Sequence, residues 1–243
     1  MSVINIKGLS VSYAKKRVLT NIFLDIESSH IYGILGPNGA GKSTFFKALL
    51  GILKNYQGQI TFFDESIEEI RNRIAYVPQR DDVDWQFPAT VLDIVLIGRY
   101  PHKKFWQKIS KTDLELARKA LEDVGMLEFE DRQIEQLSGG QQQRVFIARA
   151  LCQGADIFLL DEPFVGVDVM TEDKIITILK NLAQQGKTVL VVHHDLESVR
   201  SYFDKVILIN QRLIAYGNTE TTFTDANIAK TFGAQLIFLH NPI

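Results

Sequence analysis

The stretch GPNGAGKST, residues 36–44, contains the sequence feature that decides the fold. Its spacing matches G-x-x-x-x-G-K-[ST], a loop whose glycines let successive backbone N–H groups turn toward phosphate oxygens. An apolar strand pattern, IYGIL, precedes the loop, and a helical pattern, STFFKALLG, follows it. The positive N-terminal end of that helix would strengthen phosphate binding. We therefore predict a phosphate-binding loop between a strand and a helix that begins at about residue 42.

The loop supplies two kinds of phosphate ligand. Lys42 can bridge the β- and γ-phosphates of a nucleoside triphosphate, and the Ser43 hydroxyl can ligate Mg²⁺. The other positions are expected to approach the phosphates mainly through the backbone: Gly36, Pro37, Asn38, Gly39, Ala40, Gly41 and Thr44. The alternative is a glycine loop that carries a lysine by chance, and the flanking strand and helix argue against it.

A second apolar strand pattern, IFLLDE at 157–162, ends in two carboxylates. At the end of such a strand Asp161 would hold Mg²⁺ through water. Glu162 follows directly, so its side chain points in a different direction, where it can polarise a water in line with the γ-phosphate. We therefore predict that Glu162 is the base in hydrolysis.

Five short apolar runs bounded by turn residues predict buried parallel strands. They cover 31–36, 74–78, 157–162, 188–194 and 205–210. Helical patterns lie between them, and the one at 172–186 has Gly186 as its expected C-terminal cap. This alternation predicts an α/β fold with a mostly parallel sheet.

Two parts of the chain depart from that alternation. Alternating strands at 1–30 and about 56–65 predict an antiparallel patch, whereas about 90–154 lacks a strand pattern and is predicted to be helical. Within the helical part, Thr112 is the expected N-cap of TDLELARKALEDVGM. We predict one domain with three parts: a core that includes the antiparallel patch (about 1–89 and 155–225), a helical subdomain (about 90–154) and a C-terminal tail (about 226–243).

The composition of the 243 residues limits the possible functions. A formal net charge of −2 argues against non-specific binding to nucleic acid, which needs clustered lysine and arginine. The single cysteine, Cys152, lies in an apolar helical stretch and is expected to be buried. The N-terminus lacks a signal-peptide pattern, and no apolar run is long enough for a membrane helix, so we expect a chain that does not span the bilayer.

A second helix start suited to an anion lies in EQLSGGQQQRVFIARAL, residues 135–151. Ser138 is the expected N-cap, and Gly139 and Gly140 would leave the free N–H groups of the helix uncovered. Apolar residues with helical spacing predict that the body of this helix is buried: Val145, Ala148 and Cys152. Taken alone, this pattern could also be an ordinary capped surface helix.

LSGGQ, at 137–141 between the loop and IFLLDE, resembles the signature of the ABC (ATP-binding cassette) ATPases. The resemblance covers essentially the whole chain and implies a P-loop NTPase fold that binds ATP with Mg²⁺. In that family two cassettes pack head to tail, and each signature closes over the nucleotide on the partner's phosphate loop. The resemblance therefore implies that the chain pairs with a copy of itself or with a similar chain, and we expect a homodimer. The signature residues would contact nucleotide: Ser138, Gly139, Gly140 and Gln141.

Four further residues match the family pattern one at a time. Tyr13 matches the aromatic residue that stacks on adenine, although it could also be an ordinary strand-end tyrosine. Gln79 matches the glutamine that touches Mg²⁺ or the attacking water and senses the membrane partner. Asp168 matches the loop aspartate at the dimer interface, and His194 matches the switch histidine that contacts the γ-phosphate. The adjacent His193 would point to the opposite face of an extended strand and is expected to be structural.

The loop FVGVDVMTE departs from the common Ser-x-Leu-Asp form. Together with DWQFPATV and VVHHDLESV it resembles the branch that serves importers of manganese, zinc or iron, with manganese the nearest. That resemblance implies permease subunits, an extracytoplasmic metal-binding protein and a place on the cytoplasmic face of the membrane. The segment after Gln79 contains Trp85, Phe87, Tyr100, Phe105 and Trp106, and we weigh it equally as a permease-docking surface and as internal packing.

Three other readings of the motifs stay open at this stage. An ABC ATPase that works without a permease usually has two cassettes or a long coiled-coil insert, and this chain has neither. LSGGQ argues against a P-loop kinase. A non-catalytic regulator would be expected to lack Glu162 or His194, and both are present.

Overall fold

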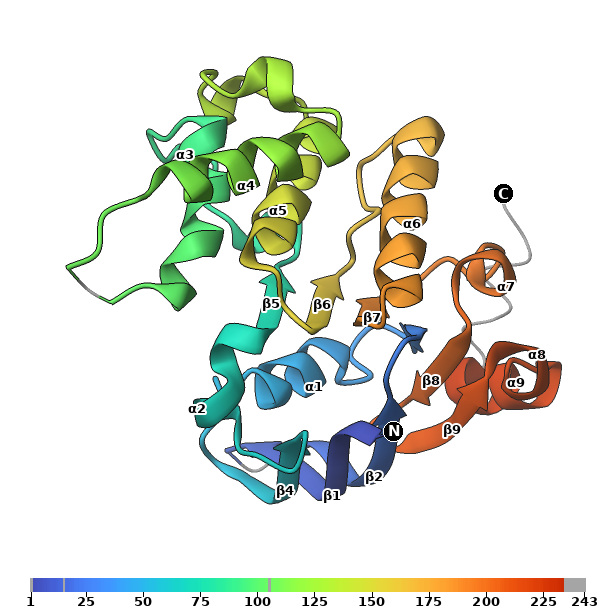
Figure 1. Ribbon diagram of the computed structural model, residues 1–243. Helices are drawn as coiled ribbons and strands as arrows, with labels where there is room; N and C mark the ends of the chain where they lie inside the picture. Colours follow the sequence, from blue (N-terminus) through green and yellow to red (C-terminus); the bar gives the residue numbers. More distant parts are fainter. Residues whose placement is uncertain (1, 15, 105, 234–243) are drawn as a thin grey trace. The chain divides into compact units, whose positions relative to one another are not determined.

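The structure is a computed structural model that describes residues 2–14, 16–104 and 106–233. By its internal contacts the chain divides into two compact units. The first unit comprises Met1–Arg71 and Leu190–Ile243, and the second comprises Asn72–Val189. Figure 1 shows the elements of both units, and each unit is described by itself. The proposed boundaries of the helical subdomain, about 90–154, stay a prediction.

The first unit contains an antiparallel sheet in the order β2-β1-β4. Its strands are β1 (Ser2–Tyr13), β2 (Lys16–Glu27) and β4 (Tyr56–Phe62). Buried and exposed residues largely alternate along β2, because one face of the sheet packs inward and the other faces water. Ile4, Ile6 and Leu24 are among the buried side chains. The predicted antiparallel patch is therefore confirmed.

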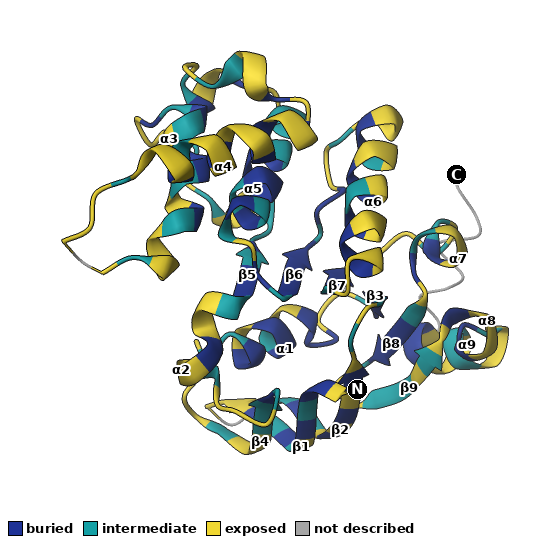
Figure 2. Ribbon diagram, viewed as in Figure 1, coloured by how far each residue is buried: buried dark blue, intermediate teal, exposed yellow. Residues whose placement is uncertain are grey.

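The first unit also contains β3 (Ile31–Leu35), which pairs in parallel with β8 (Lys205–Ile209). β9 (Leu213–Asn218) then pairs with β8 antiparallel. β3 is buried along its whole length and β8 along all but its first residue, as Figure 2 shows by colour. The helices of this unit are α1 (Lys42–Leu49), α2 (Ile67–Ile70), α7 (Val199–Tyr202), α8 (Thr219–Thr222) and α9 (Asp225–Phe232).

The second unit contains β5 (Ile74–Val77) and β6 (Ile157–Asp161), which pair in parallel. Its helices are α3 (Val91–Leu96), α4 (Lys111–Asp123), α5 (Gly139–Gln153) and α6 (Val169–Gln184), with 3₁₀ turns at Arg80–Asp82, Ile97–His102, Leu127–Phe129 and Ile134–Gln136. Among the described residues of 90–154 no strand occurs apart from an isolated bridge between Thr90 and Gln133. The helical character predicted for this part is confirmed.

β7 (Thr188–Val192) and the 3₁₀ turn Arg71–Arg73 cross the boundaries between the two units. All five predicted parallel strands are present, and each ends one or two residues before its predicted end. Within the described ranges, no helix is both long enough and apolar enough to cross a membrane.

The predicted N-cap of α4 at Thr112 is wrong, because the helix begins two residues earlier. Ser110 is the N-cap: its Oγ accepts from the Asp113 N–H at 3.2 Å, and the Asp113 carboxylate accepts from the Ser110 N–H at 2.8 Å. This reciprocal pair satisfies two N–H groups at the start of the helix. The predicted C-cap of α6 at Gly186 is wrong by one residue, because Gln185 is the C-cap and Gly186, at φ +87°, is the residue just beyond it.

Asp113→Asn is expected to lower the free energy of unfolding by about 2 kcal/mol at neutral pH. The Asp113 carboxylate is buried, receives hydrogen bonds from Lys103 and Ser110, and pairs with Arg99 at 3.1 Å. These contacts hold its pKa well below the ordinary value of 3.8. Because the folded-state pKa is the lower one, the stabilisation is complete above about pH 4 and is lost as the pH falls toward the folded-state value.

Urea unfolding at pH 7 and at pH 3 measures this contribution. The difference between wild type and Asp113→Asn should shrink at pH 3, since part of the wild-type stabilisation is then lost. Asp123→Asn is the matched control on the same helix, because Asp123 forms an exposed pair with Lys119 and should change the free energy by less than about 1 kcal/mol. Equal effects of the two substitutions would contradict the prediction.

Candidate functional site

The phosphate loop (residues 36–44) connects β3 to α1, as the sequence predicts. At two positions of the loop, neighbouring atoms leave no room for a side chain larger than that of glycine. A Cβ on Gly36 would lie 2.0 Å from the backbone oxygen of Ile209, and a Cβ on Gly41 would lie 2.6 Å from Leu19 Cδ2. Gly41 also has φ +98°, a conformation that other residues rarely adopt. A larger residue at either position would push the loop away from β8 or β2.

The Lys42 side chain lies within the loop and is only 7% exposed. Its Nζ donates to the backbone oxygens of Gly36, at 2.7 Å, and Pro37, at 3.1 Å. These bonds hold the ammonium group against the loop backbone, which keeps a positive charge among the glycines. The arrangement is suited to an anion that approaches the loop from the solvent side.

The remaining loop positions differ in their exposure. Asn38, Gly39 and Ser43 are exposed, and Thr44 is half-buried. The N–H of the buried Ala40 donates to the Pro37 oxygen at 3.1 Å and closes a turn inside the loop. The Ser43 hydroxyl is accessible for Mg²⁺, although ligation by Ser43 stays a prediction.

In the second unit, Gln79 and Glu162 lie in direct contact. Gln79 follows β5, Glu162 follows β6, and these two strands are neighbours, so both side chains lie at the carboxyl edge of the strand pair. Gln79 Nε2 donates to Glu162 Oε2 at 3.1 Å. Asp161, the last residue of β6, is 2% exposed. The structure therefore brings together two residues that are 83 positions apart in the sequence.

Glu162 has a strained backbone, with φ +51°. This left-handed conformation is uncommon for residues other than glycine, asparagine and aspartate, and strained residues cluster at active sites. The two neighbouring side chains have different surroundings: Asp161 is buried, whereas Glu162 is half-buried and reaches Gln79. The sequence predicts that the two side chains diverge but not the backbone strain at Glu162.

The helix α5 begins where the sequence predicts, with Ser138 as its N-cap. Ser138 N–H donates to Gln141 Oε1 at 2.9 Å, and Ser138 Oγ accepts from the Gln141 N–H at 3.4 Å. The body of the helix is anchored as expected, since Val145, Ala148 and Cys152 are all buried. Burial raises the pKa of the Cys152 thiol to about 11, which fits a packing residue and not a reactive one.

Arg80 lies beside Gly139 at the start of α5, and the accessibility of the free N–H groups there stays a prediction. A Cβ on Gly139 would lie 3.1 Å from the Arg80 Cζ, and Arg80 Nη2 donates to Gln142 Oε1 at 3.3 Å. The Arg80 backbone oxygen accepts from Trp85 Nε1 at 2.8 Å, and this bond further restrains the segment from Arg80 to Trp85. The sequence patterns do not identify Arg80, and the only signal for it is a cation directly after Gln79.

Asp168 is the N-cap of α6. Its carboxylate accepts from the Thr171 hydroxyl at 2.7 Å and from the Thr171 N–H at 3.0 Å. These hydrogen bonds lower the pKa of Asp168, so the group stays ionised near neutral pH. The next two residues, Val169 and Met170, are each 73% exposed, so this helix start presents an ionised and an apolar surface together.

Tyr13 and His194 are both accessible. Tyr13 ends β1, is 46% exposed and borders a pocket of about 340 Å³, which residues 11–14 and 52–55 line. His194 is exposed just after β7, whereas the adjacent His193 is 2% exposed. The burial of His193 fits the structural role expected of it. The expected opposite directions are wrong, because both residues lie beyond the end of β7 and their ring centres are 5.8 Å apart.

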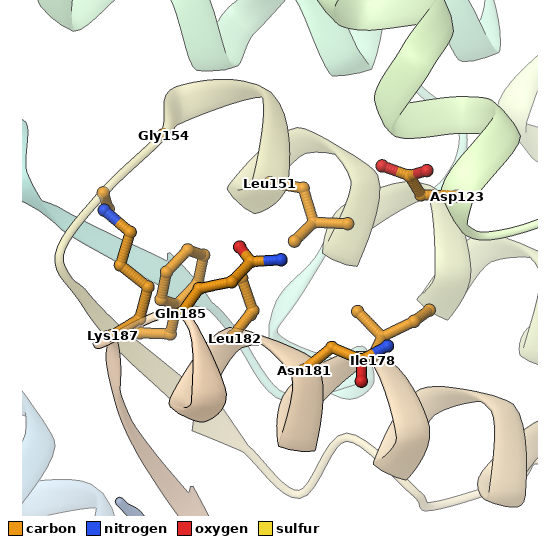
Figure 3. Close-up of a pocket in the computed structure, with 10 residues that line it drawn as sticks. Asp123, Leu151, Gly154, Ile178, Asn181, Leu182, Gln185 and Lys187 are labelled. Atoms are coloured by element: carbon orange, nitrogen blue, oxygen red, sulfur yellow. The ribbon is translucent and has the colours of Figure 1, made fainter. Parts of the chain in front are cut away.

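A separate pocket of about 370 Å³ lies in the second unit between the end of α5, β6 and α6 (Figure 3). Leu151, Phe158 and Leu182 form part of its apolar wall, and Asp123 and Lys187 contribute charges. None of its lining residues is a predicted site residue. Among the described residues, no group of three or more histidine, cysteine, aspartate and glutamate side chains is arranged to hold a metal ion.

A family model described as "ABC transporter" matches residues 19–165, which include the phosphate loop, the Ser138 helix start and the Asp161–Glu162 pair. The chain belongs to the ABC transporter family. As an ABC transporter chain of this kind it binds ATP and is an ATPase. The P-loop kinase alternative is therefore excluded.

Two curated relatives of this ABC chain match it over almost their full lengths. The Manganese transport system ATP-binding protein MntB of Bacillus subtilis is 49% identical over 100% of this chain and 97% of its own. The Zinc transport system ATP-binding protein TroB of Treponema pallidum is 48% identical over 96% of this chain and 88% of its own. Among solved structures, a metal-chelate type ABC transporter in an inward-facing conformation is 31% identical, with a TM-score of 0.83 over 95% of this chain and 88% of that chain.

Proposed function

We propose that this chain is the ATP-hydrolysing subunit of a transporter that imports a divalent metal ion, with manganese as the favoured ion and zinc or iron as alternatives. The observation that carries the proposal is the 49% identity, over the whole chain, to a manganese transport ATP-binding protein. The metal ion is the cargo of the permease and does not enter this chain. The place of the chain is then at the cytoplasmic face of the membrane, attached through permease subunits.

The first chemical step that the chain must perform is to hold the triphosphate. Lys42 gives up its bonds to the loop carbonyls and bridges the β- and γ-phosphates, while the backbone N–H groups of the loop bind the remaining oxygens. Tyr13 stacks on the adenine ring. These contacts fix the γ-phosphate before hydrolysis.

Glu162 and Gln79 act on the attacking water. The Glu162 carboxylate accepts a proton from the water as it attacks the γ-phosphate, and the Gln79 amide orients both. Mg²⁺ would be held by Ser43 and Gln79 and, through water, by Asp161, whose hydroxyl, amide and carboxylate oxygens are donors that this ion prefers. Bound Mg²⁺ supplies charge neutralisation on the phosphates. His194 contacts the γ-phosphate from its exposed position.

Two copies of the chain form the working unit in this proposal. The start of α5, with Ser138, Gly139, Gly140 and Gln141, closes over the nucleotide that the partner's phosphate loop holds, and Asp168 lies at the seam. The exposed Val169 and Met170 beside Asp168 support a contact there, because exposed apolar side chains next to a charge are typical of interfaces. Hydrolysis removes the γ-phosphate and with it the contacts that hold the closed pair.

The permease-docking surface that we propose follows Gln79. Phe87, Tyr100 and Trp106 are strongly exposed, which supports docking. Trp85 differs, because it is half-buried and its ring packs edge-on against Phe146 at 5.0 Å. Its part is to anchor the surface to α5. The prediction for Phe105 lies outside the described residues.

The test of the metal-import proposal uses the assembled transporter. The chain is reconstituted in liposomes with its permease and substrate-binding protein, and ATP hydrolysis is measured with Mn²⁺, Zn²⁺ or Fe²⁺. Manganese should raise the hydrolysis rate and be taken up into the vesicles. Equal rates with and without each of the metals would contradict metal import, and stimulation by zinc or iron alone would reassign the cargo.

Tyr13→Ala is expected to weaken ATP binding by about 1–3 kcal/mol, because base–aromatic stacking is lost. Tyr13→Trp keeps an aromatic face at the same place and should retain most of the affinity. Equilibrium titration with a fluorescent ATP analogue measures both variants. The exposed Tyr216 in β9 provides the control substitution Tyr216→Ala, which should leave the affinity unchanged. Unchanged affinity of Tyr13→Ala would assign Tyr13 a purely structural place at the strand end.

A further inference from the structure

His193 is a buried polar residue that the proposed reaction does not use. It follows β7 directly, and its N–H donates to the Ile34 oxygen in β3 at 3.1 Å. The imidazole packs beside two aromatic rings, with its ring centre 6.0 Å from that of Tyr202 and 5.3 Å from that of Phe203. Backbone and ring are therefore both held, so the side chain has a defined direction.

Space for this packing comes from a glycine in the neighbouring strand. A Cβ on Gly33 would lie 2.6 Å from Phe203 Cδ2, so any larger residue at this position would displace the Phe203 ring from β3. The packed ring then excludes water from His193. Burial lowers the pKa of His193 to about 4, and the nearby Asp195 only partly opposes this. The imidazole is neutral at pH 7, with a proton on one ring nitrogen.

The hydrogen bonds around Ser198 decide which nitrogen carries that proton. Ser198 Oγ lies 2.6 Å from Asp195 Oδ2 and 2.8 Å from His193 Nε2. An ionised carboxylate can only accept, so the Ser198 hydroxyl donates to Asp195. Ser198 Oγ is then free to accept from His193 Nε2, and this arrangement favours the tautomer with its proton on Nε2. The result is a directed chain from His193 Nε2–H to Ser198 and on to the Asp195 carboxylate.

The same carboxylate organises the backbone of the turn. Asp195 Oδ1 accepts from the Glu197 N–H at 3.0 Å, and Asp195 Oδ2 accepts from the Ser198 N–H at 3.3 Å. Hydrogen bonds lower the pKa of Asp195 against the effect of burial, so it remains an acceptor at neutral pH. The Asp195 side chain thus closes the turn from Asp195 to Ser198, and the hydrogen bond between Ser198 and His193 connects this turn to the core.

In the sequence, His194 lies between His193 and Asp195, the two ends of this series of hydrogen bonds. Its ring is exposed, and its centre is 5.8 Å from that of His193. One peptide unit links it to the buried His193, and another links it to Asp195. Its backbone direction is therefore set on both sides, even though the ring itself faces solvent.

We propose that His193 is a positioning residue for His194. The buried imidazole donates a hydrogen bond to Ser198, and Ser198 donates one to Asp195. These two bonds fix the turn that aims His194 at the γ-phosphate. The inference rests on the proposed function, because it takes His194 to act on nucleotide. It assigns His193 no contact with ATP. Its effect on catalysis passes entirely through the orientation of its neighbour.

The first test compares two substitutions in the assembled transporter. His193→Gln keeps an N–H donor near the position of Nε2, whereas His193→Leu fills a similar space and has no donor. We expect His193→Leu to lower kcat about tenfold with little change in KM for ATP, and His193→Gln to restore most of the rate. Equal rates for His193→Leu and wild type would overturn the proposal.

The second test asks whether the effect passes through His194. His193→Leu and Ser198→Ala are each measured in wild type and in a His194→Ala background. If His193 acts by aiming His194, neither change should lower kcat further once His194 is absent. The same fold-loss in both backgrounds would mean a general structural role and would overturn the proposal. Ser198→Ala leaves the buried ring in place, so it decides the question if His193→Leu does not fold.

An independent readout comes from ¹⁵N NMR of the full chain. The His193 Nε2–H should be visible in wild type as a slowly exchanging proton and should be lost or shifted in Ser198→Ala. An Nδ1–H tautomer would overturn the bond chain itself. If the bond chain is present but His194→Ala hydrolyses ATP at the wild-type rate, the role of His194 is wrong, and the failure lies in the proposed function.

Discussion

Glu162→Gln is expected to reduce ATP hydrolysis by about a thousandfold while ATP binding persists. The substitution removes one negative charge and the capacity to take a proton from water, and it changes the size of the side chain very little. A glutamine can still accept from Gln79 Nε2 through its amide oxygen, so the contact at 3.1 Å can survive. The backbone strain at φ +51° is the same for either residue. The expected loss of ATP hydrolysis therefore comes from the missing proton acceptor and not from a change in structure.

The measurement is steady-state phosphate release together with nucleotide affinity for the same purified protein. Because the variant binds ATP without cleaving it, we also expect a dimer that persists with ATP and Mg²⁺ in gel filtration. Glu68→Gln is the matched control, since Glu68 is an exposed residue of α2 and its substitution should change neither rate nor oligomeric state. Near-normal turnover would remove Glu162 from the role of base, and a strictly monomeric variant would contradict the shared nucleotide sites.

Much of the fold could be predicted because buried strands leave a continuous apolar record. The runs that became β3, β6 and β8 are apolar on both faces and are bounded by turn residues, so their ends differ from the predicted ones by one residue. The phosphate loop is equally local: its spacing and the flanking elements determine it. Ser138 was identifiable for the same reason, since an N-cap depends only on the next three residues.

The start of α4 shows how a local rule can mislead. Ser110 and Thr112 are both good N-caps, and each is followed three positions later by an acidic residue that can complete a capping box. Asp113 stands three positions after Ser110, whereas Glu115 stands three after Thr112, so the pattern allowed either. The structure uses Ser110, because its capping partner Asp113 is buried and also forms an ion pair with Arg99. That long-range partner is not visible in the local pattern.

The contacts around the candidate site could not be predicted because they join distant parts of the chain. Arg80 lies against Gly139 and Gln142, about sixty positions away, and no spacing rule connects them. The Gln79–Glu162 hydrogen bond depends on the pairing of β5 with β6 and on a left-handed backbone at Glu162. Sequence patterns identified both members of that pair, but only their arrangement shows that they meet.

Lys42→Ala is expected to weaken ATP binding at least a hundredfold. The ammonium group forms two charge-assisted hydrogen bonds in the loop, and its proposed bonds to the β- and γ-phosphates would be of the same kind, each worth about 1.5–3 kcal/mol. Loss of two such bonds corresponds to about a hundredfold in affinity or more. Alanine leaves the glycine framework of the loop intact, so the loss reports on the charge.

Thermal unfolding with and without ATP separates binding from folding for this variant. A ligand at a hundred times its Kd stabilises the folded state by about 2.7 kcal/mol, so wild type should show a clear rise in Tm with ATP. Lys42→Ala should lose most of that rise at the same ATP concentration. Lys47→Ala is the control, because Lys47 is an exposed cation on the same helix and should keep the full rise. A full rise in Lys42→Ala would mean that the loop binds phosphate through its backbone alone, and the Lys42 assignment would be wrong.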